Sequence, residues 1–176
     1  MLLKPGHQFR QVAGPEAKIE LEEAIALDRN FAGAFSQLAI TLNYLGQPEA
    51  AIPLQEKALR LEPQSSNNHV YNWALGFSHL LLGHDGEAVD LFKKARAANP
   101  RLAYIHLSLA AALGLKGDID EARASLAEAI RIKPAWDTMA HFLADCTSCN
   151  FDSPPYRALV EKTVRVGLRR AGLPEE

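Results

Sequence analysis

The apolar and polar positions of this chain follow a repeated frame of glycine, alanine, alanine and proline. In each frame the first alanine comes five positions after the glycine, the second seven positions later, and the proline five after that. The three frames are Gly46, Ala51, Ala58, Pro63; Gly83, Ala88, Ala95, Pro100; and Gly117, Ala122, Ala129, Pro134. A fixed period of this size predicts helical hairpins that bury their apolar faces by stacking on one another. The pattern therefore indicates an all-α superhelix of antiparallel hairpins.

Glycine and proline set the ends of the expected helices. The frame glycine ends the first helix of each hairpin in the left-handed conformation, and the frame proline ends the second. Asp85 and Asp118 are expected to cap the helices that follow, and Pro53 is expected to bend the helix that contains it. The expected helices cover residues 15–28, 31–45, 48–61, 68–82, 85–98, 101–116, 119–132, 135–147 and 155–171.

The frames also divide the chain into segments. Consecutive frame prolines are 34 residues apart between Pro100 and Pro134 but 37 apart between Pro63 and Pro100, which places a longer loop near residues 66–68. The expected segments are an irregular stretch 1–14, a solenoid 15–150 and a C-terminal capping helix and tail 151–176. Within the solenoid we expect a half-repeat 15–31, repeats 32–65, 69–102 and 103–136, and a degenerate repeat 137–150.

Composition places the chain among ordinary soluble proteins. It has 176 residues, of which 48% are apolar and 23% charged, with a formal net charge of -2 and a pI near 6.3. This balance gives no general attraction for nucleic acid or an anionic membrane. The N-terminus lacks a signal-peptide pattern, and the run at residues 80–82 is too short to span a bilayer. We therefore expect a cytoplasmic protein that uses neither membrane nor nucleic acid.

The repeated unit resembles the tetratricopeptide repeat, whose signature is W-x2-L-G-x2-Y, then A-x3-F, then P. The middle unit matches it with Leu75, Gly76, Gly83, Ala88, Phe92, Ala95 and Pro100, and departs from it at Asn72 and His79. The runs "NFAGAFSQLAITLNYLGQPEAAIPLQEKALRLEP", "WALGFSHLLLGHDGEAVDLFKKARAANP" and "GLRRAGLPEE" also resemble the repeat tails of bacterial class III adenylate or guanylate cyclases and related winged-helix regulators. The resemblance implies a protein-binding module in bacterial signalling or regulation, without cyclase activity.

The resemblance also implies where a partner binds. In tetratricopeptide repeats the first helix of each hairpin lines the concave groove, and here those positions are apolar and aromatic. We expect a helical or extended apolar segment of a partner to bind there. The expected groove residues are Ser36, Ile40, Tyr44, Val70, Trp73, Phe77, Leu81, Tyr104, Leu107 and Ala111. The Lys, Asn and Arg clamp of chaperone-docking relatives is missing, because its positions hold Ser36, Ile40, Ala74, Tyr104 and Ser108.

Two alternatives to an open groove remain. The aromatic residues are core if the groove closes on itself, in which case the chain is a structural or oligomerising module. The chain's own helix 155–171 either lies in the groove or covers the last repeat, and terminal repeats need such a cover. The basic residues of this helix form a solvated face or contact an acidic partner.

Catalytic and metal chemistry have weak signals. Cys146 and Cys149 form a C-x-x-C pair at the end of an expected helix, where the helix dipole does not lower a thiol pKa, and no second ligand pair accompanies them. The six histidines are dispersed, and packing explains His79 and His106. We expect no enzyme, no cofactor and no metal, with a metal or redox protein built on the two cysteines as the alternative.

The N-terminal half-repeat lacks a partner helix. Ala17, Leu21, Ala24 and Ile25 form an apolar stripe that nothing in the pattern covers. We expect either Leu2, Leu3, Phe9 and Val12 to fold over it or two chains to form a homodimer through it.

Overall fold

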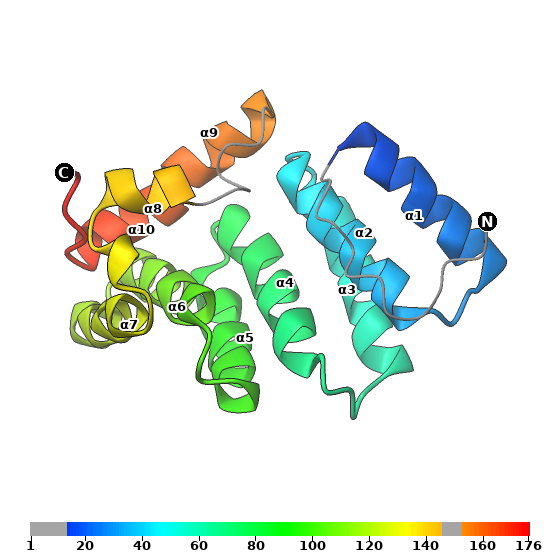
Figure 1. Cartoon of the computed structure of the whole chain (residues 1–176), viewed down its shortest axis with the longest axis horizontal. Helices are drawn as coiled ribbons and strands as arrows, with labels where there is room; N and C mark the ends of the chain where they lie inside the picture. Colours follow the sequence, from blue (N-terminus) through cyan, green and yellow to red (C-terminus); the bar gives the residue numbers. More distant parts are fainter. Residues whose placement is uncertain (1–13, 146–152) are drawn as a thin grey trace.

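The computed structural model describes residues 14–145 and 153–176, and all regular elements in these ranges are helical (Figure 1). The elements are α1 Pro15–Leu27, α2 Ala32–Tyr44, α3 Pro48–Leu61, α4 Asn68–Leu81, α5 Asp85–Ala98, α6 Ala103–Lys116, α7 Ile119–Ile132, η1 Pro134–Trp136, α8 Met139–Asp145, α9 Pro154–Lys162 and α10 Val164–Arg170. The predicted helices at 48–61, 85–98 and 119–132 have the same bounds as α3, α5 and α7.

The helices pair as successive hairpins along one superhelix. The helices α2 and α3, α4 and α5, and α6 and α7 pack against each other within hairpins, and α3 on α4 and α5 on α6 join neighbouring hairpins. In Figure 1 the helices α1 to α7 follow one another along an arc, and α10 and α9 run back from its α6–α7 end toward α2. The all-α superhelix predicted from the repeated frame is confirmed.

Each hairpin turn depends on the frame glycine. Gly46, Gly83 and Gly117 have φ angles of 75°, 74° and 94°, a region that favours glycine. The residue after each glycine donates its backbone N–H to the carbonyl five positions earlier, as in His84 to His79 at 2.9 Å. This hydrogen bond closes the C-terminus of each first helix.

The predicted aspartate caps are not formed. Asp118 immediately precedes α7, but its carboxylate accepts a hydrogen bond from Lys116 Nζ at 2.6 Å instead of capping the helix. Asp85 is the first residue of α5, and the residue before that helix makes no side-chain cap hydrogen bond either. The starts of these helices are therefore held by packing of the hairpins.

Two predicted helices are interrupted. The expected helix at 135–147 becomes η1 and α8, and residues 146 and 147 lie outside the described ranges. The expected helix at 155–171 divides into α9 and α10 at Thr163, whose φ and ψ of -119° and -78° depart from the helical values. Thr163 and Val164 are adjacent β-branched residues, which favour helix less than their unbranched neighbours, and both are buried.

The largest core cluster joins distant parts of the chain. It includes the inner sides of α4 and α6 together with Tyr156, Val160, Val164 and Leu168 of the C-terminal helices. A smaller cluster joins α1 to the first hairpin through Leu21. The C-terminal helices are therefore part of the main core.

Candidate functional site

A partly enclosed cavity of about 370 Å³ lies between the first helices of the three hairpins and the C-terminal part of the chain. We call it the inner cavity. Its lining residues are Gln37, Ile40, Tyr44, Val70, Trp73, Phe77, Tyr104, Leu107, Ser108, Lys133, Trp136, Phe142, Asp145, Tyr156, Val160 and Val164. The size and the mainly apolar, aromatic lining are typical of the pockets in which proteins bind small apolar groups, which span about 300–1,000 Å³.

Aromatic rings pack against one another along the groove side of the cavity. The Trp73 and Phe77 rings stack with centroids 5.3 Å apart, and the Tyr104 ring meets Trp73 edge-on at 5.1 Å. The indole N–H of Trp73 donates to Ser108 Oγ at 3.0 Å, which fixes the indole between α4 and α6. A ring cluster held in this way presents a preformed apolar surface.

Tyr104 remains a neutral phenol in this setting. Burial, followed by the nearby Tyr44, raises its pKa to about 12. At neutral pH it therefore adds no charge to the cavity.

A charged pair lies at the other side of the cavity. Asp145 accepts hydrogen bonds from Lys133 Nζ and from Trp136 Nε1, the latter at 2.8 Å. The bond from Lys133, followed by that from Trp136, holds the pKa of Asp145 below its usual range. The Lys133 ammonium also lies 4.5 Å from the centre of the Trp136 ring. The two charges satisfy each other, so the lining carries no net charge.

Most of the predicted groove residues meet in this cavity. Ile40, Tyr44, Val70, Trp73, Phe77, Tyr104 and Leu107 line it. The other three do not: Ser36 and Leu81 are buried away from it, and Ala111 lies beneath α10. The structure thus brings seven of the ten expected groove residues together at one cavity, and their role in binding a partner stays a prediction.

Several lining residues were not predicted from the sequence. Lys133, Trp136, Phe142 and Asp145 come from η1, α8 and the residues beside them, which have no place in the repeat register. The helix expected at 135–147 contains three of them, but nothing in its pattern predicted that it borders the groove.

The C-terminal helices occupy part of the groove. The α10 helix packs along α6 and touches α7 only slightly. Tyr156 of α9 packs against Tyr44, with ring centroids 5.4 Å apart, and against Phe77 at 6.4 Å. Of the two positions considered for the helix 155–171, α10 occupies the groove side of α6, and only the tail after it pairs with α8.

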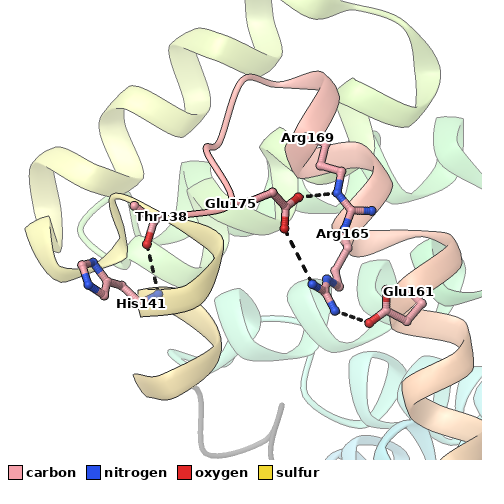
Figure 2. A network of polar contacts seen from close by, with 6 residues as sticks. All are labelled: Thr138, His141, Glu161, Arg165, Arg169 and Glu175. Carbon is pink, nitrogen blue, oxygen red and sulfur yellow. Dashed lines mark hydrogen bonds and ion pairs between the residues drawn. The ribbon is translucent and has the colours of Figure 1, made fainter.

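Hydrogen bonds and ion pairs hold that tail in place (Figure 2). The backbone N–H of Met139 donates to the carbonyl of Pro174 at 2.7 Å, and that of Ala140 to Glu175 at 3.1 Å. The Glu175 carboxylate pairs with Arg169 and, at 3.8 Å, with Arg165, which also pairs with Glu161. These two arginines of the basic C-terminal region therefore have acidic partners within the chain.

The remaining chemical candidates have no assembled site in the described parts of the chain. Cys146 and Cys149 lie outside those parts, as do Leu2, Leu3, Phe9 and Val12. Across residues 14–145 and 153–176, no group of three or more His, Cys, Asp or Glu side chains is arranged to hold a metal. His106 is buried, and its Nε2 is 2.8 Å from the Pro100 carbonyl, as expected for a packing role. Of the helices described, none is both long and apolar enough to cross a bilayer.

Comparison with known proteins supports the repeat assignment. Two tetratricopeptide-repeat family models match the chain, over residues 31–61 and 103–135. A comparison with curated proteins gave no match. The family matches and the fold together show that the chain contains tetratricopeptide repeats.

Solved structures with a similar fold include MamA proteins. A MamA crystal structure is 19% identical, with a TM-score of 0.62, and the match covers 87% of this chain and 85% of that one. MamA residues 41 to the end from Desulfovibrio magneticus RS-1 are 18% identical, with a TM-score of 0.62 and coverage of 89% and 84%. The structure titled MamA MSR-1 C2 is 25% identical over 66% of each chain, with a TM-score of 0.56. These matches do not support the resemblance to cyclase tails; they indicate a tetratricopeptide-type helical solenoid, a fold that serves as a protein-interaction scaffold.

Proposed function

We propose that this protein is an interaction scaffold whose inner cavity receives a bulky apolar side chain from an extended segment of a partner protein. The observation that carries the proposal is that the first helices of all three hairpins converge on one aromatic cavity that residues 14–145 and 153–176 leave unfilled. Signalling in bacteria has no support from the comparisons and forms no part of the proposal.

The size of the cavity favours a side chain over a helix. One turn of an α-helix, about 10 Å wide and 5.4 Å long, occupies roughly 400 Å³ without counting its neighbours. The inner cavity has about 370 Å³, which is less than one such turn, and α9 and α10 narrow the groove around it. One or two large side chains from an extended segment fit this space.

The lining favours aromatic and branched apolar groups. The stacked Trp73 and Phe77 rings and the edge of Tyr104 offer apolar contact area, and the neighbouring Lys133–Asp145 pair satisfies its own charges. Residues of the Trp and Tyr type commonly contribute about 2 kcal/mol or more each to an interface. We expect the partner's side chain to contact Trp73 and Trp136 together.

A peptide-display selection against the full chain tests the proposal. Selected peptides should share a Trp, Phe, Tyr or Leu, and calorimetry should show that replacing it by alanine weakens binding at least tenfold. Val70→Trp fills the cavity from α4 and should weaken binding to a similar extent, whereas Ala97→Trp at an exposed site of α5 should not. Equal binding by the two tryptophan variants would contradict the proposal.

The alternative is a structural module whose groove is filled by itself. The packing of α10 along α6 favours this alternative, since it already covers part of the groove. In that case Val70→Trp should change the stability of the fold without changing peptide binding. Peptides from the display selection should then bind the wild type and the Val70→Trp variant equally well.

A further inference from the structure

Two histidines lie side by side where the second hairpin turns. His79 is in the last turn of α4, and His84 follows that helix in the turn to α5. Their Nδ1 atoms are 3.3 Å apart, their ring centroids are 5.5 Å apart, and the ring planes differ by 45°. This pair is separate from the inner cavity, whose lining contains neither residue.

The backbone of the turn holds the two rings together. The N–H of His84 donates to the carbonyl of His79 at 2.9 Å, and that of Gly83 donates to Leu80 at 3.0 Å. Gly83 is in the left-handed conformation, and together with these two bonds it forms the C-terminal cap of α4. This cap places His79 and His84 in contact. The imidazoles are therefore neighbours because of the fold itself.

The same turn recurs in the other hairpins without this chemistry. Gln47 donates to Leu42 at 2.9 Å, and Asp118 donates to Leu113 at 3.0 Å. Leu42 and Gln47 in the first hairpin, and Leu113 and Asp118 in the third, do not form a pair of nitrogen ligands. Turn formation thus does not require histidines, and their pairing is particular to the second hairpin.

The spacing of the two nitrogens fits a shared metal ion. A tetrahedral metal with nitrogen ligands at about 2.0–2.1 Å holds two of them roughly 3.3 Å apart. The carbonyls at the C-terminus of α4 give that end a partial negative charge, which favours a cation. In the structure this contact is a hydrogen bond in which one Nδ1–H donates to the other Nδ1; in the tautomer that carries the proton on Nε2 of both rings, the two Nδ1 lone pairs face one ion.

The surroundings of the pair also act on His79. Burial, followed by the neighbouring His84, lowers the pKa of His79. The charges of Glu87 on α5 and Glu56 on α3 act on His79 in the opposite direction, which places two carboxylates in the electrostatic surroundings of the pair.

We propose that His79 and His84 form an open two-histidine site for a divalent transition metal of the Cu²⁺, Ni²⁺ or Zn²⁺ class. No third His, Cys, Asp or Glu completes the set in the described residues, so water or a group from another molecule fills the remaining positions. Imidazole ligands suit these metals, with Cu²⁺ the tightest of the three.

Copper titration tests the site. The titration uses the Cys146→Ser, Cys149→Ser variant, so that the thiols of the C-x-x-C motif cannot bind the added copper. Added CuCl2 at pH 7.5 should bind with one ion per chain in calorimetry, and its electron paramagnetic resonance spectrum should show coupling to two nitrogens.

Variants distinguish this site from other histidines. His79→Gln or His84→Gln should weaken copper binding at least tenfold and remove the two-nitrogen coupling. His69→Gln, at an exposed histidine on the same α4 helix, should leave both unchanged. Undiminished binding in both single variants, or no binding by the parent at 100 µM copper, would overturn the proposal.

Discussion

Gly114 of α6 and Gly167 of α10 meet backbone to backbone. A Cβ atom at residue 114 would overlap the carbonyl of Gly167, and one at residue 167 would overlap the carbonyl of Ala111. The two helices approach this closely because neither has a side chain at the crossing. This contact places α10 in the groove and thereby sets the size of the inner cavity.

The close crossing of α6 and α10 predicts that adding one methyl group at Gly167 destabilises the fold. Gly167→Ala should lower the free energy of unfolding by about 1–3 kcal/mol, because the added carbon meets backbone that cannot move aside. Gly86→Ala in α5 is the control, since nothing lies within 4 Å of its added carbon, and it should be neutral or stabilising by up to about 1 kcal/mol. Urea denaturation measures both. If Gly167→Ala is as stable as the wild type, α10 does not cross α6 as described.

Gln55 of α3 should be a site of stabilising substitution. Its side chain is fully buried, and within the described parts of the chain neither its amide nitrogen nor its oxygen has a hydrogen-bond partner. The same repeat position holds Phe92 and Leu126 in the next two hairpins. Gln55→Leu should raise the free energy of unfolding by about 1–2 kcal/mol because it removes an unpaired buried amide.

The control for this substitution is Gln47→Leu, at an exposed position, which should stay within about 0.5 kcal/mol of the wild type. A loss of stability in Gln55→Leu would show that the amide has a bonding partner, such as a buried water.

Tyr104 should ionise at a higher pH than an exposed tyrosine, and its ionisation should destabilise the fold. Its folded-state pKa of about 12 exceeds the unfolded value of 10.0, so the neutral phenol favours the folded state. This contribution is present at neutral pH and is reduced as the pH rises above 10 toward 12. Phenolate absorbance should show a tyrosine ionising near pH 12 that Tyr104→Phe removes. If the phenolate absorbance of the wild type and of Tyr104→Phe rises identically above pH 10.5, the ring of Tyr104 is not buried as described.

The apolar stripe of α1 that was expected to be uncovered packs on the first hairpin through Leu21, Ala24 and Ile25, so a homodimer should instead form through the outer face of α1. Ile19 and Leu27 expose 57% and 90% of their surface, while Leu21 on the other side is buried against the first hairpin. Light scattering over a concentration series should show a rise toward twice the chain mass, and Ile19→Glu with Leu27→Glu should abolish it. A mass fixed at one chain across the series would rule out the homodimer.

The repeat register explains why the central groove residues were predictable. Trp73 and Phe77 are at positions that face inward in every hairpin of this fold, so the frame of Gly83 and Pro100 places them without knowledge of other contacts. The close approach at Gly167 was not predictable in this way, because periodicity reports which residues are buried and not which distant helix buries them. The break at Thr163 has the same origin, since it depends on how α9 and α10 fit against α2 and α6.

Intermolecular contacts of a bound peptide test the central proposal most directly. Nuclear Overhauser effects can be measured between the aromatic side chain of a display-selected peptide and the indole protons of the protein. The account predicts contacts from that side chain to both Trp73 and Trp136, with α9 and α10 still in place. Contacts confined to the outer helices α3, α5 and α7, or release of α10 from α6 on binding, would contradict it.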